Sequence, residues 1–266
     1  MSLKDRIKKK KKGLLIGSNS YISLNFTESF NKIAAKIEYN KRENGDMVYA
    51  ISSVTENEGK STCAANIAIA LANRGNKVIL IDFDCKKPAL YKIFNQSYNE
   101  NREIANLLNG KIQESDFKFK KVGKKNLFLA LNTKPYPEYH KWFENGSVEE
   151  FVEAMKKHAD FIIIDTAPFS VDSSVTNVMR FSDETILVIR TDCVTATAIN
   201  DSVSVVQKVS KSFMGCVLND VYPRVAPFSF SGNDQSVQYG HYSKNGKYGK
   251  YGRYGRYGRY GNYGKY

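Results

Sequence analysis

Four consecutive segments between residues 47 and 81 constrain the fold of this chain most tightly. Residues 47–51 form a short, continuously apolar run, which is typical of a strand buried on both faces. In residues 59–74 the apolar positions recur at helical spacing, and Gly75 follows where a helix commonly ends. Residues 77–81 are a second apolar run. A strand, a turn, a helix and a strand within about 35 residues make a βαβ unit, which implies a parallel sheet.

The same alternation of apolar runs and helical patterns continues along the chain. We expect further strands at residues 126–131, 161–164, 185–189 and 214–218, and helices at residues 148–157 and 196–209. An amphipathic helix that begins at Thr27 and ends in the polar residues 40–46 precedes the first strand. The charged residues 111–125 are expected to form a surface connection. The predicted fold class is α/β, with a mostly parallel sheet of about six strands flanked by helices.

The turn between the first strand and its helix contains Gly59, Lys60 and Ser61. This is the end of a phosphate-binding loop, in which backbone N–H groups face the phosphates, the lysine reaches the β/γ oxygens and the hydroxyl holds Mg²⁺. The first glycine of the full pattern would be residue 54, which is Val54, so the motif is incomplete. Its place after a buried strand nevertheless predicts a P-loop NTPase, a Rossmann-like arrangement.

Three residues of this turn need a particular conformation if the loop is to hold phosphates. We expect Asn57 to supply the left-handed backbone that glycine usually provides. Glu56 and Glu58 have to point away from the phosphates, because carboxylates would repel them.

Carboxylates follow two of the predicted strands. Asp82 and Asp84 end the second strand, and Asp165 ends a later one. Because ligands of open parallel sheets bind at the carboxyl ends of the strands, these acids should converge on the phosphate loop, where they could position Mg²⁺ and deprotonate a hydroxyl. The competing interpretation of an Asp after a strand is that it caps the next helix.

Three motifs together resemble those of the bacterial tyrosine kinases that regulate capsule and exopolysaccharide synthesis. The stretches are Gly59-Lys-Ser-Thr62, Asp82-Phe-Asp84-Cys-Lys86-Lys-Pro88 and Asp165-Thr-Ala-Pro168. They are similar to the Walker A, Walker A′ and Walker B motifs of that family, whose C-terminal tyrosine cluster is the autophosphorylation site. The resemblance runs from about Thr27 to the C-terminus and includes residues 215–219.

The resemblance implies a role for each matching residue. ATP would be held by Gly59, Lys60, Ser61, Thr62 and Asn219, and Mg²⁺ by Ser61, Asp84 and Asp165. The catalytic residues would be Lys60, Asp82 and Asp84, with Asp82 as the base for the tyrosine hydroxyl.

Two positions depart from the family pattern. Lys86 stands where the A′ motif usually has arginine, so a point charge replaces a bidentate fork. The family's ExxRxxR helix, used in ring assembly, appears here with Glu28, Asn31 and Ala34, so both arginines are missing. The second departure puts the ring in doubt, although not the chemistry.

The charge of the chain is concentrated at its ends. The formal net charge is +13, of which residues 1–12 carry +6 and residues 239–266 carry +7, so that residues 13–238 are balanced. A broadly basic nucleic-acid-binding domain is therefore not expected. We divide the chain into a basic leader (1–12), an N-terminal helical segment (13–45), a P-loop kinase core (46–223) and a disordered, tyrosine-rich tail (224–266).

Nine of the 17 tyrosines fall in the last 28 residues, mostly in Lys/Arg-Tyr-Gly repeats. The tail could be a phosphoacceptor, a binder of single-stranded nucleic acid or polysaccharide, or a segment without function. Attached to a kinase-like core, the phosphoacceptor interpretation is favoured, with Tyr248, Tyr251, Tyr254, Tyr257, Tyr260, Tyr263 and Tyr266 as acceptors. Because each phosphate adds about −1.5 to −2, roughly four would cancel the charge of the tail.

These observations predict a cytoplasmic, ATP- and Mg²⁺-dependent protein-tyrosine kinase that phosphorylates its own tail. No apolar run approaches the roughly 18 to 20 residues of a membrane span. The resemblance implies a transmembrane adaptor related to polysaccharide chain-length regulators, through which the chain would lie at the plasma membrane. It also implies a phosphotyrosine phosphatase, tail phosphorylation in trans and a possible homo-oligomer, and no nucleic-acid partner is expected.

Two alternatives remain open. One is a MinD/ParA-type ATPase, although those proteins carry a lysine five residues before the Walker lysine, where this chain has Thr55. The other is a nucleotide-gated RNA-binding protein that uses the basic, tyrosine-rich tail.

Overall fold

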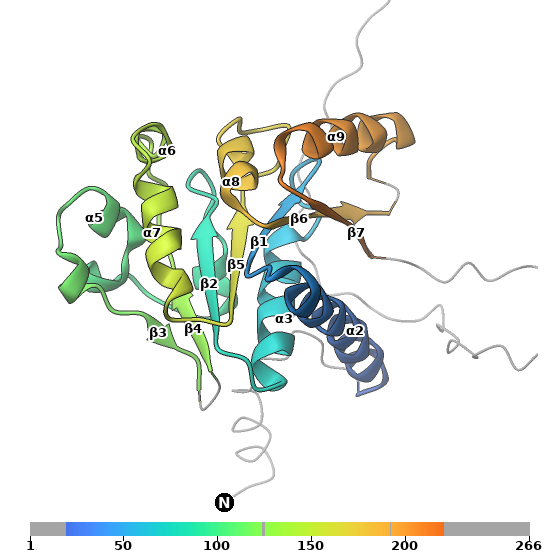
Figure 1. The fold of residues 1–266 in the computed structure, drawn as a ribbon, viewed down its shortest axis with the longest axis horizontal. Coiled ribbons are helices and arrows are strands. Elements are labelled where there is room, and N and C mark those ends of the chain that lie inside the picture. Colours follow the sequence, from blue (N-terminus) through green and yellow to red (C-terminus); the bar gives the residue numbers. More distant parts are fainter. Residues whose placement is uncertain (1–19, 124–125, 192, 221–266) are drawn as a thin grey trace, which may run out of the picture. The chain divides into compact units, whose positions relative to one another are not determined.

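The computed structural model describes residues 20–123, 126–191 and 193–220, with side chains described from Thr27 onward. Seven strands form one sheet in the order β3-β4-β2-β5-β1-β6-β7 (Figure 1). Their bounds are β1 Val48–Ser53, β2 Val78–Phe83, β3 Lys120–Lys121, β4 Leu127–Ala130, β5 Phe161–Thr166, β6 Glu184–Arg190 and β7 Phe213–Asn219. All neighbouring pairs are parallel except β3 with β4.

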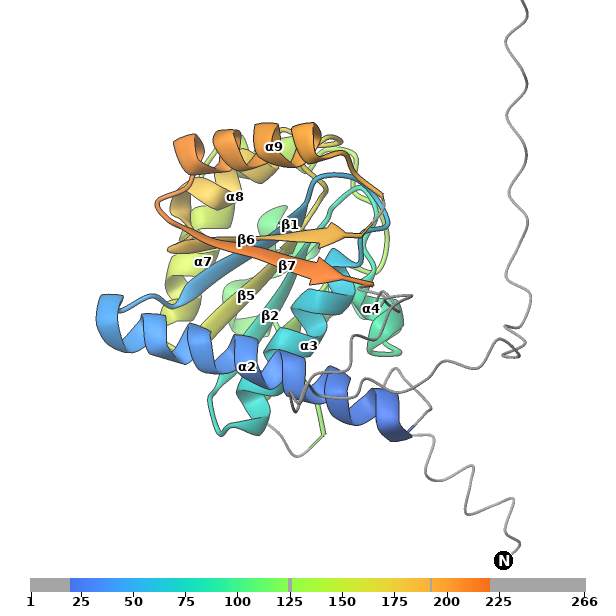
Figure 2. The ribbon, with the colours of Figure 1, turned by 90° about the vertical axis from the view of Figure 1, so that its right-hand side faces the viewer.

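Helices cover both faces of this sheet (Figure 2). The α-helices are α2 Ser20–Asn44, α3 Lys60–Asn73, α4 Leu90–Ile93, α5 Ile104–Leu108, α6 His140–Glu144, α7 Ser147–Lys156, α8 Val175–Phe181 and α9 Ala196–Val209, and Glu100–Arg102 and Glu114–Asp116 are 3₁₀ turns. Helices α2 and α3 lie on one face, and α7, α8 and α9 lie on the other. The short helix α4 lies beyond the carboxyl ends of the strands.

Alternating residues along a central strand pack into the apolar clusters on opposite faces of the sheet. On β1, Tyr49 and Ile51 join the apolar cluster under α2 and α3, whereas Val48 and Ala50 join the one under α6 and α7. All four side chains have no exposed surface, because β1 lies in the middle of the sheet and is covered on both sides. This explains why the central strands are continuously apolar in the sequence. The fold class predicted from the sequence is confirmed.

Helix α2 is longer than predicted. It begins at Ser20, seven residues before the expected start at Thr27, and it ends at Asn44. Phe30, Ala34 and Ile37 are buried against α3, so the predicted apolar face is the one that packs. The sequence allows this earlier start, because Ile22 and Phe26 precede Phe30 at four-residue spacing.

The predicted surface connection at residues 111–125 is only partly right. It contains the two-residue strand β3, which pairs antiparallel with β4 at the edge of the sheet. A strand this short has no periodicity to read, and its two lysines are typical of an exposed edge. The short helices α4, α5, α6 and α8 escaped prediction for the same reason, since one or two turns carry little pattern.

Within the described residues, none of the helices combines the length and the apolar character needed to cross a bilayer.

Candidate nucleotide and phosphoryl-transfer site

The strand order brings the predicted site residues to one edge of the sheet. Strand β5 lies between β2 and β1, and its Asp165 is in register with Asp82 of β2 and Ile51 of β1. The turn after β1 therefore ends beside both acidic strand ends. Parallel strands all present their carboxyl ends at this edge, which is why three segments far apart in sequence meet here.

The turn between β1 and α3 adopts the backbone that phosphate binding needs. Asn57 has φ +63° and Gly59 has φ +87°, both in the left-handed region. The expectation for Asn57 is confirmed. A Cβ on residue 59 would lie 2.3 Å from Nδ2 of Asn219, so this position needs glycine for space as well as for conformation. Helix α3 begins at Lys60, directly after the left-handed Gly59, and its N-terminus opens toward the carboxylates.

A buried carboxylate holds the turn in shape. Glu58 is 1% exposed, and it accepts hydrogen bonds from the backbone N–H and the hydroxyl of Thr55 and, at 3.1 Å, from the backbone N–H of Arg190. The side chain of Asn219 donates to the Glu58 carbonyl at 2.9 Å. Glu58 therefore points away from the phosphate side, as expected, and ties the turn to the ends of β6 and β7. The exposed Glu56 pairs instead with Lys87, at 2.8 Å.

Lys60 lies among the acids. Its Nζ donates to Oδ2 of Asp84 at 2.6 Å and lies 3.9 Å from Oδ1 of Asp165. It also donates to the Ser61 hydroxyl at 3.3 Å. Burial disfavours the charged ammonium, but the charges of Asp165 and Asp84 outweigh this, so the pKa of Lys60 is raised.

Asp165 is fully buried, and neither carboxylate oxygen has a hydrogen-bond partner among the described residues. Burial raises its pKa to about 6, against the opposing effects of the Lys60 charge and of the nearby Ser61 hydroxyl. A buried carboxylate without donors is costly, and such groups are usually completed by a cation or by water. Asp165 is thus positioned as a ligand or acceptor for a group that the described residues do not supply.

Asp82 combines both interpretations raised from the sequence. Its carboxylate accepts hydrogen bonds from the backbone N–H groups of Asp84, Ala89 and Leu90, so it fixes the turn that leads into α4. It is fully buried, and desolvation together with Asp165 and Asp84 raises its pKa well above the ordinary value. The capping role is present in the structure, while the raised pKa is compatible with proton transfer near neutral pH.

Sequence reasoning missed a second cluster next to these acids. Lys86 donates to the carbonyl of Val171 at 2.9 Å and lies 3.7 Å from Oδ2 of Asp172, which accepts a 2.6 Å bond from the Tyr139 hydroxyl. Burial alone would raise the pKa of Asp172, but its bonds with Tyr139 and Ser174 and the charge of Lys86 lower it. The cluster joins the loop after β2 to the loop after β5. Only the Lys86 departure hinted at it in the sequence.

The residues present fit a nucleotide with Mg²⁺. The partnerless oxygens of Asp165, the adjacent Asp84 and the Ser61 hydroxyl are hard oxygen ligands of the kind Mg²⁺ prefers. In the described part of the chain, no group of three or more His, Cys, Asp or Glu side chains could hold a metal ion. Thr62 follows in the first turn of α3, and the predicted acceptor tyrosines of the tail lie outside the described residues.

Comparison with known families decides the assignment. The model of the AAA domain family matches residues 48–218, which is well over half of the chain. The chain belongs to the AAA domain family. The match runs from β1 into β7 and includes every described residue of the predicted site except Asn219, which directly follows its last residue.

Among the relatives of this AAA domain chain are proteins named as bacterial tyrosine kinases. It is 28% identical over 206 residues to the tyrosine-protein kinase CpsD of Streptococcus agalactiae, covering 77% of this chain and 88% of that one. Its fold is similar to the kinase domain of the Escherichia coli tyrosine kinase ETK, with a TM-score of 0.68, 21% identity and coverage of 78% and 80%. The Mg-ADP complex of MinD from Pyrococcus horikoshii is less similar, with a TM-score of 0.55, 22% identity and coverage of 65% and 69%. The resemblance to bacterial tyrosine kinases is confirmed.

Proposed function

We propose that this protein is an ATP- and Mg²⁺-dependent protein-tyrosine kinase that phosphorylates its own C-terminal tyrosine cluster and thereby regulates capsular or exopolysaccharide synthesis and export. The observation that carries the proposal is the convergence of Lys60, Asp84 and Asp165 at the N-terminus of α3, where within the described part of the chain neither buried oxygen of Asp165 has a hydrogen-bond partner of normal geometry. The tyrosine-protein kinase name of the streptococcal relative supports the reaction class.

Each site residue has a task in this proposal. The α3 N-terminus and Gly59 take the phosphates, and Lys60 leaves its pairing with Asp84 to contact the β/γ oxygens. Ser61, Asp84 and Asp165 would hold Mg²⁺, and the bound ion would supply positive charge beside the transferred phosphoryl group. Asp82 accepts the proton of the incoming tyrosine hydroxyl. Asn219 keeps the loop closed through the Glu58 carbonyl and lines the nucleotide site.

The acceptors are the tail tyrosines Tyr248, Tyr251, Tyr254, Tyr257, Tyr260, Tyr263 and Tyr266. Phosphorylation of about four of them would cancel the +7 carried by residues 239–266. The basic leader keeps its charge, so the tail carries the part of the net charge that the reaction changes. We infer that transfer occurs in trans, from one copy to the tail of another, and that a phosphotyrosine phosphatase reverses it.

The proposed partner is a transmembrane adaptor of the polysaccharide chain-length-regulator type, which would place a cytoplasmic kinase at the inner face of the membrane. A ring built on the ExxRxxR helix is not part of the proposal. Ala34, at the place of the second arginine, is fully buried against α3, and Glu28 is paired with Lys32 at 3.2 Å on the same helix. Any homo-oligomer would use other contacts.

A MinD-type positioning ATPase is the weaker candidate. The fold similarity to MinD is real but lower, and Thr55 stands at the place of the additional lysine. In the structure the Thr55 hydroxyl is bonded at 2.8 Å to Glu58, within its own loop. Incubation with ATP and Mg²⁺, with and without an adaptor's cytoplasmic segment, separates the two: phosphotyrosine supports the kinase, whereas ATP hydrolysis stimulated by lipid or DNA without tyrosine labelling supports the ATPase.

A further inference from the structure

A second pocket lies at the same edge of the sheet as the proposed catalytic site. It has a volume of about 330 Å³ and is lined by Tyr91, Gln96, Ser97, Tyr98, Thr133 and Lys134. Tyr91 belongs to α4, whose first residue bonds to Asp82, and Thr133 follows Asn132, whose side chain donates to the Asp82 carbonyl. The pocket is thus attached to the Asp82 turn through both of its walls. Its volume suits one side chain rather than a whole nucleotide.

The pocket and its surroundings combine aromatic faces with cations, with Tyr91, Tyr98 and Lys134 in the lining and Lys92 and Tyr136 beside it. Nζ of Lys134 lies 5.2 Å from the centre of the Tyr98 ring and 5.5 Å from that of Tyr136, and Nζ of Lys92 lies 5.4 Å from the Tyr91 ring. Neither lysine has a carboxylate within 4.0 Å among the described residues. Tyr98 is 53% exposed, a large fraction for an aromatic side chain held in place by its neighbours.

The carboxylate of Glu103, which bonds to the lining residue Thr133, is already occupied. Glu103 is 1% exposed, and its oxygens accept bonds from the Thr133 N–H, the Thr133 hydroxyl and the Tyr136 hydroxyl. The Thr133 hydroxyl therefore donates to Glu103. Lys134 and the Ser97 hydroxyl are the remaining hydrogen-bond donors for a ligand among these lining residues. A group that fits must be flat, apolar on its faces and anionic at one end.

We propose that this pocket binds a phosphorylated tyrosine side chain, with its ring against Tyr91 and Tyr98 and its phosphate on Lys134. The proposal rests on the proposed function for its source, the phosphorylated tail repeats of another copy of this chain. The charge of the tail repeat determines whether its phosphorylated or its unmodified form binds the pocket. An unmodified repeat carries lysine or arginine beside almost every tyrosine and is repelled by Lys92 and Lys134, whereas each phosphate adds about −1.5 to −2 and reverses the sign.

Binding of the product would favour repeated transfer along one tail. The repeats place tyrosines three residues apart, and three extended residues span at most about 11 Å. A tail held by one phosphotyrosine therefore keeps its next acceptor at high effective concentration near the same sheet edge.

Synthetic peptides test this site without any need for kinase activity. The probe is a fluorescein-labelled peptide of residues 247–258, either unmodified or with phosphate on all four tyrosines, added to the full chain with excess Mg-ADP to block the phosphate loop. Fluorescence anisotropy should show binding of the phosphopeptide and at least about tenfold weaker binding of the unmodified peptide. Lys134→Ala and Tyr98→Ala should each weaken the phosphopeptide by about tenfold or more.

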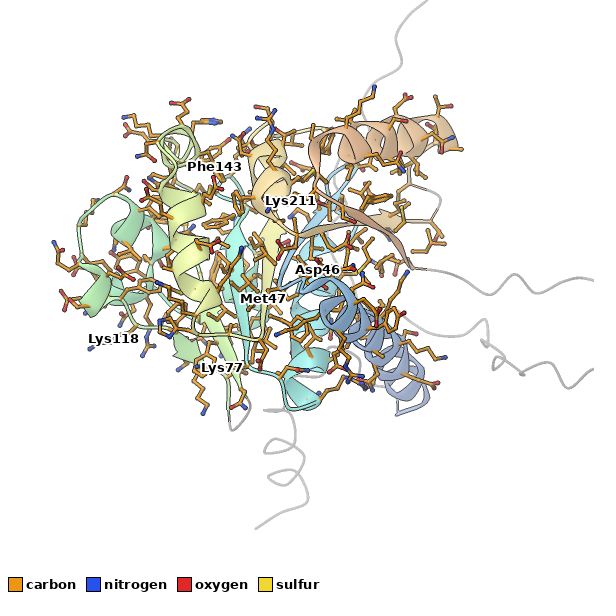
Figure 3. The ribbon with its side chains drawn as sticks, in the orientation of Figure 1. Asp46, Met47, Lys77, Lys118, Phe143 and Lys211 are labelled. Carbon is orange, nitrogen blue, oxygen red and sulfur yellow. The ribbon has the colours of Figure 1, made fainter. Side chains whose placement is uncertain are left out.

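Lys77→Ala is the matched control, because Lys77 is also an exposed lysine over an aromatic ring, 5.8 Å from the Phe128 centre, but lies at the amino end of β2 (Figure 3). It should bind the phosphopeptide as the unaltered chain does. The proposal is overturned if both peptide forms bind equally, if Lys134→Ala binds normally, if Mg-ADP displaces the phosphopeptide, or if inorganic phosphate competes as well as phosphotyrosine does. A chain that binds the phosphopeptide yet never labels its own tail would refute the proposed function and leave this pocket intact.

Discussion

Lys60 and Asp84 form a buried ion pair in which Nζ lies 2.6 Å from Oδ2, with side-chain exposures of 11% and 3%. The lysine comes from the first turn of α3 and the aspartate from the turn after β2, 24 residues later. In the structure, Lys60, the proposed phosphate contact, is paired with Asp84, a proposed Mg²⁺ ligand. Binding of Mg-ATP would provide a new partner for each of them, so the pair marks both ends of the proposed reaction site.

Replacement of Asp165 by asparagine should stabilise the protein without nucleotide and abolish its activity. The folded-state pKa of Asp165 is about 6, above the ordinary value of 3.8, so the folded state binds its proton more tightly and loses stability as the pH rises through that interval. At pH 8 Asp165→Asn should raise the free energy of unfolding by about 1 to 3 kcal/mol. At pH 4 the difference should be smaller, because the carboxyl is then protonated in the folded state and about half protonated in the unfolded state.

Urea denaturation at the two pH values measures this difference, and Asp201→Asn, at an exposed aspartate of α9, serves as control. A variant that is less stable than the unaltered chain at pH 8 would show that Asp165 is already satisfied by the protein.

Replacement of Glu58 by glutamine should weaken nucleotide binding by loosening the loop. The amide keeps one acceptor but places an NH₂ group against a backbone N–H that the carboxylate now accepts from, either at Thr55 or at Arg190. We expect about tenfold weaker binding of ATP and a loss of about 1 to 2 kcal/mol in the free energy of unfolding. Isothermal titration calorimetry tests it against Glu56→Gln, whose carboxylate is in the same loop but exposed. Equal affinities for the two variants would contradict the loop-holding role.

Two replacements of Asp82 separate its two tasks. Asp82→Asn keeps acceptor capacity for the N–H groups of Ala89 and Leu90 but removes the base, so labelling should fall by about 10²-fold or more with little change in ADP affinity. Asp82→Ala removes all three acceptor contacts and should also lower the free energy of unfolding by about 2 to 4 kcal/mol. Near-normal labelling by Asp82→Asn would leave Asp82 with a structural role alone.

We expect Lys86 to affect the rate of tyrosine labelling by holding the loop after β2 against the loop after β5. Lys86→Ala removes the contacts with Val171 and Asp172, and we expect labelling to fall by about tenfold, mainly in kcat. Lys86→Arg should restore the rate or exceed it, because a planar guanidinium can serve both acceptors at once. Lys87→Ala, at a neighbouring exposed lysine, is the control. The interpretation fails if Lys86→Ala and Lys87→Ala have the same steady-state kinetics.

The sequence predicted the elements whose side chains alternate or repeat over many residues. Helix α9 has the predicted bounds, and each of the six parallel strands appears within two residues of its expected position. The central strands are recognisable because burial on both faces leaves a continuous apolar run, whereas the edge strand β7 keeps an apolar run although its residues are only partly buried. The convergence of Asp82 and Asp165 was also predicted, since it follows from strand polarity alone.

Contacts between segments far apart in the chain were not predictable from one sequence. Nothing in the pattern says that Glu58 reaches Arg190, 132 residues away, or that Tyr139 shares Asp172 with Lys86. These pairs depend on how loops of different strands pack at the sheet edge, and loop residues carry no periodicity. The order of the strands, with β5 between β2 and β1, likewise comes only from the structure.

The central claim is tested most directly by mapping phosphate on the full-length protein after incubation with ATP and Mg²⁺. Tandem mass spectrometry should find phosphotyrosine within residues 247–266 of the unaltered chain, and at normal levels in Lys118→Met, a control at an exposed lysine (Figure 3). Lys60→Met should show none. Unmodified tail tyrosines in the unaltered chain even with an adaptor's cytoplasmic segment, or equal labelling of Lys60→Met, would contradict the account.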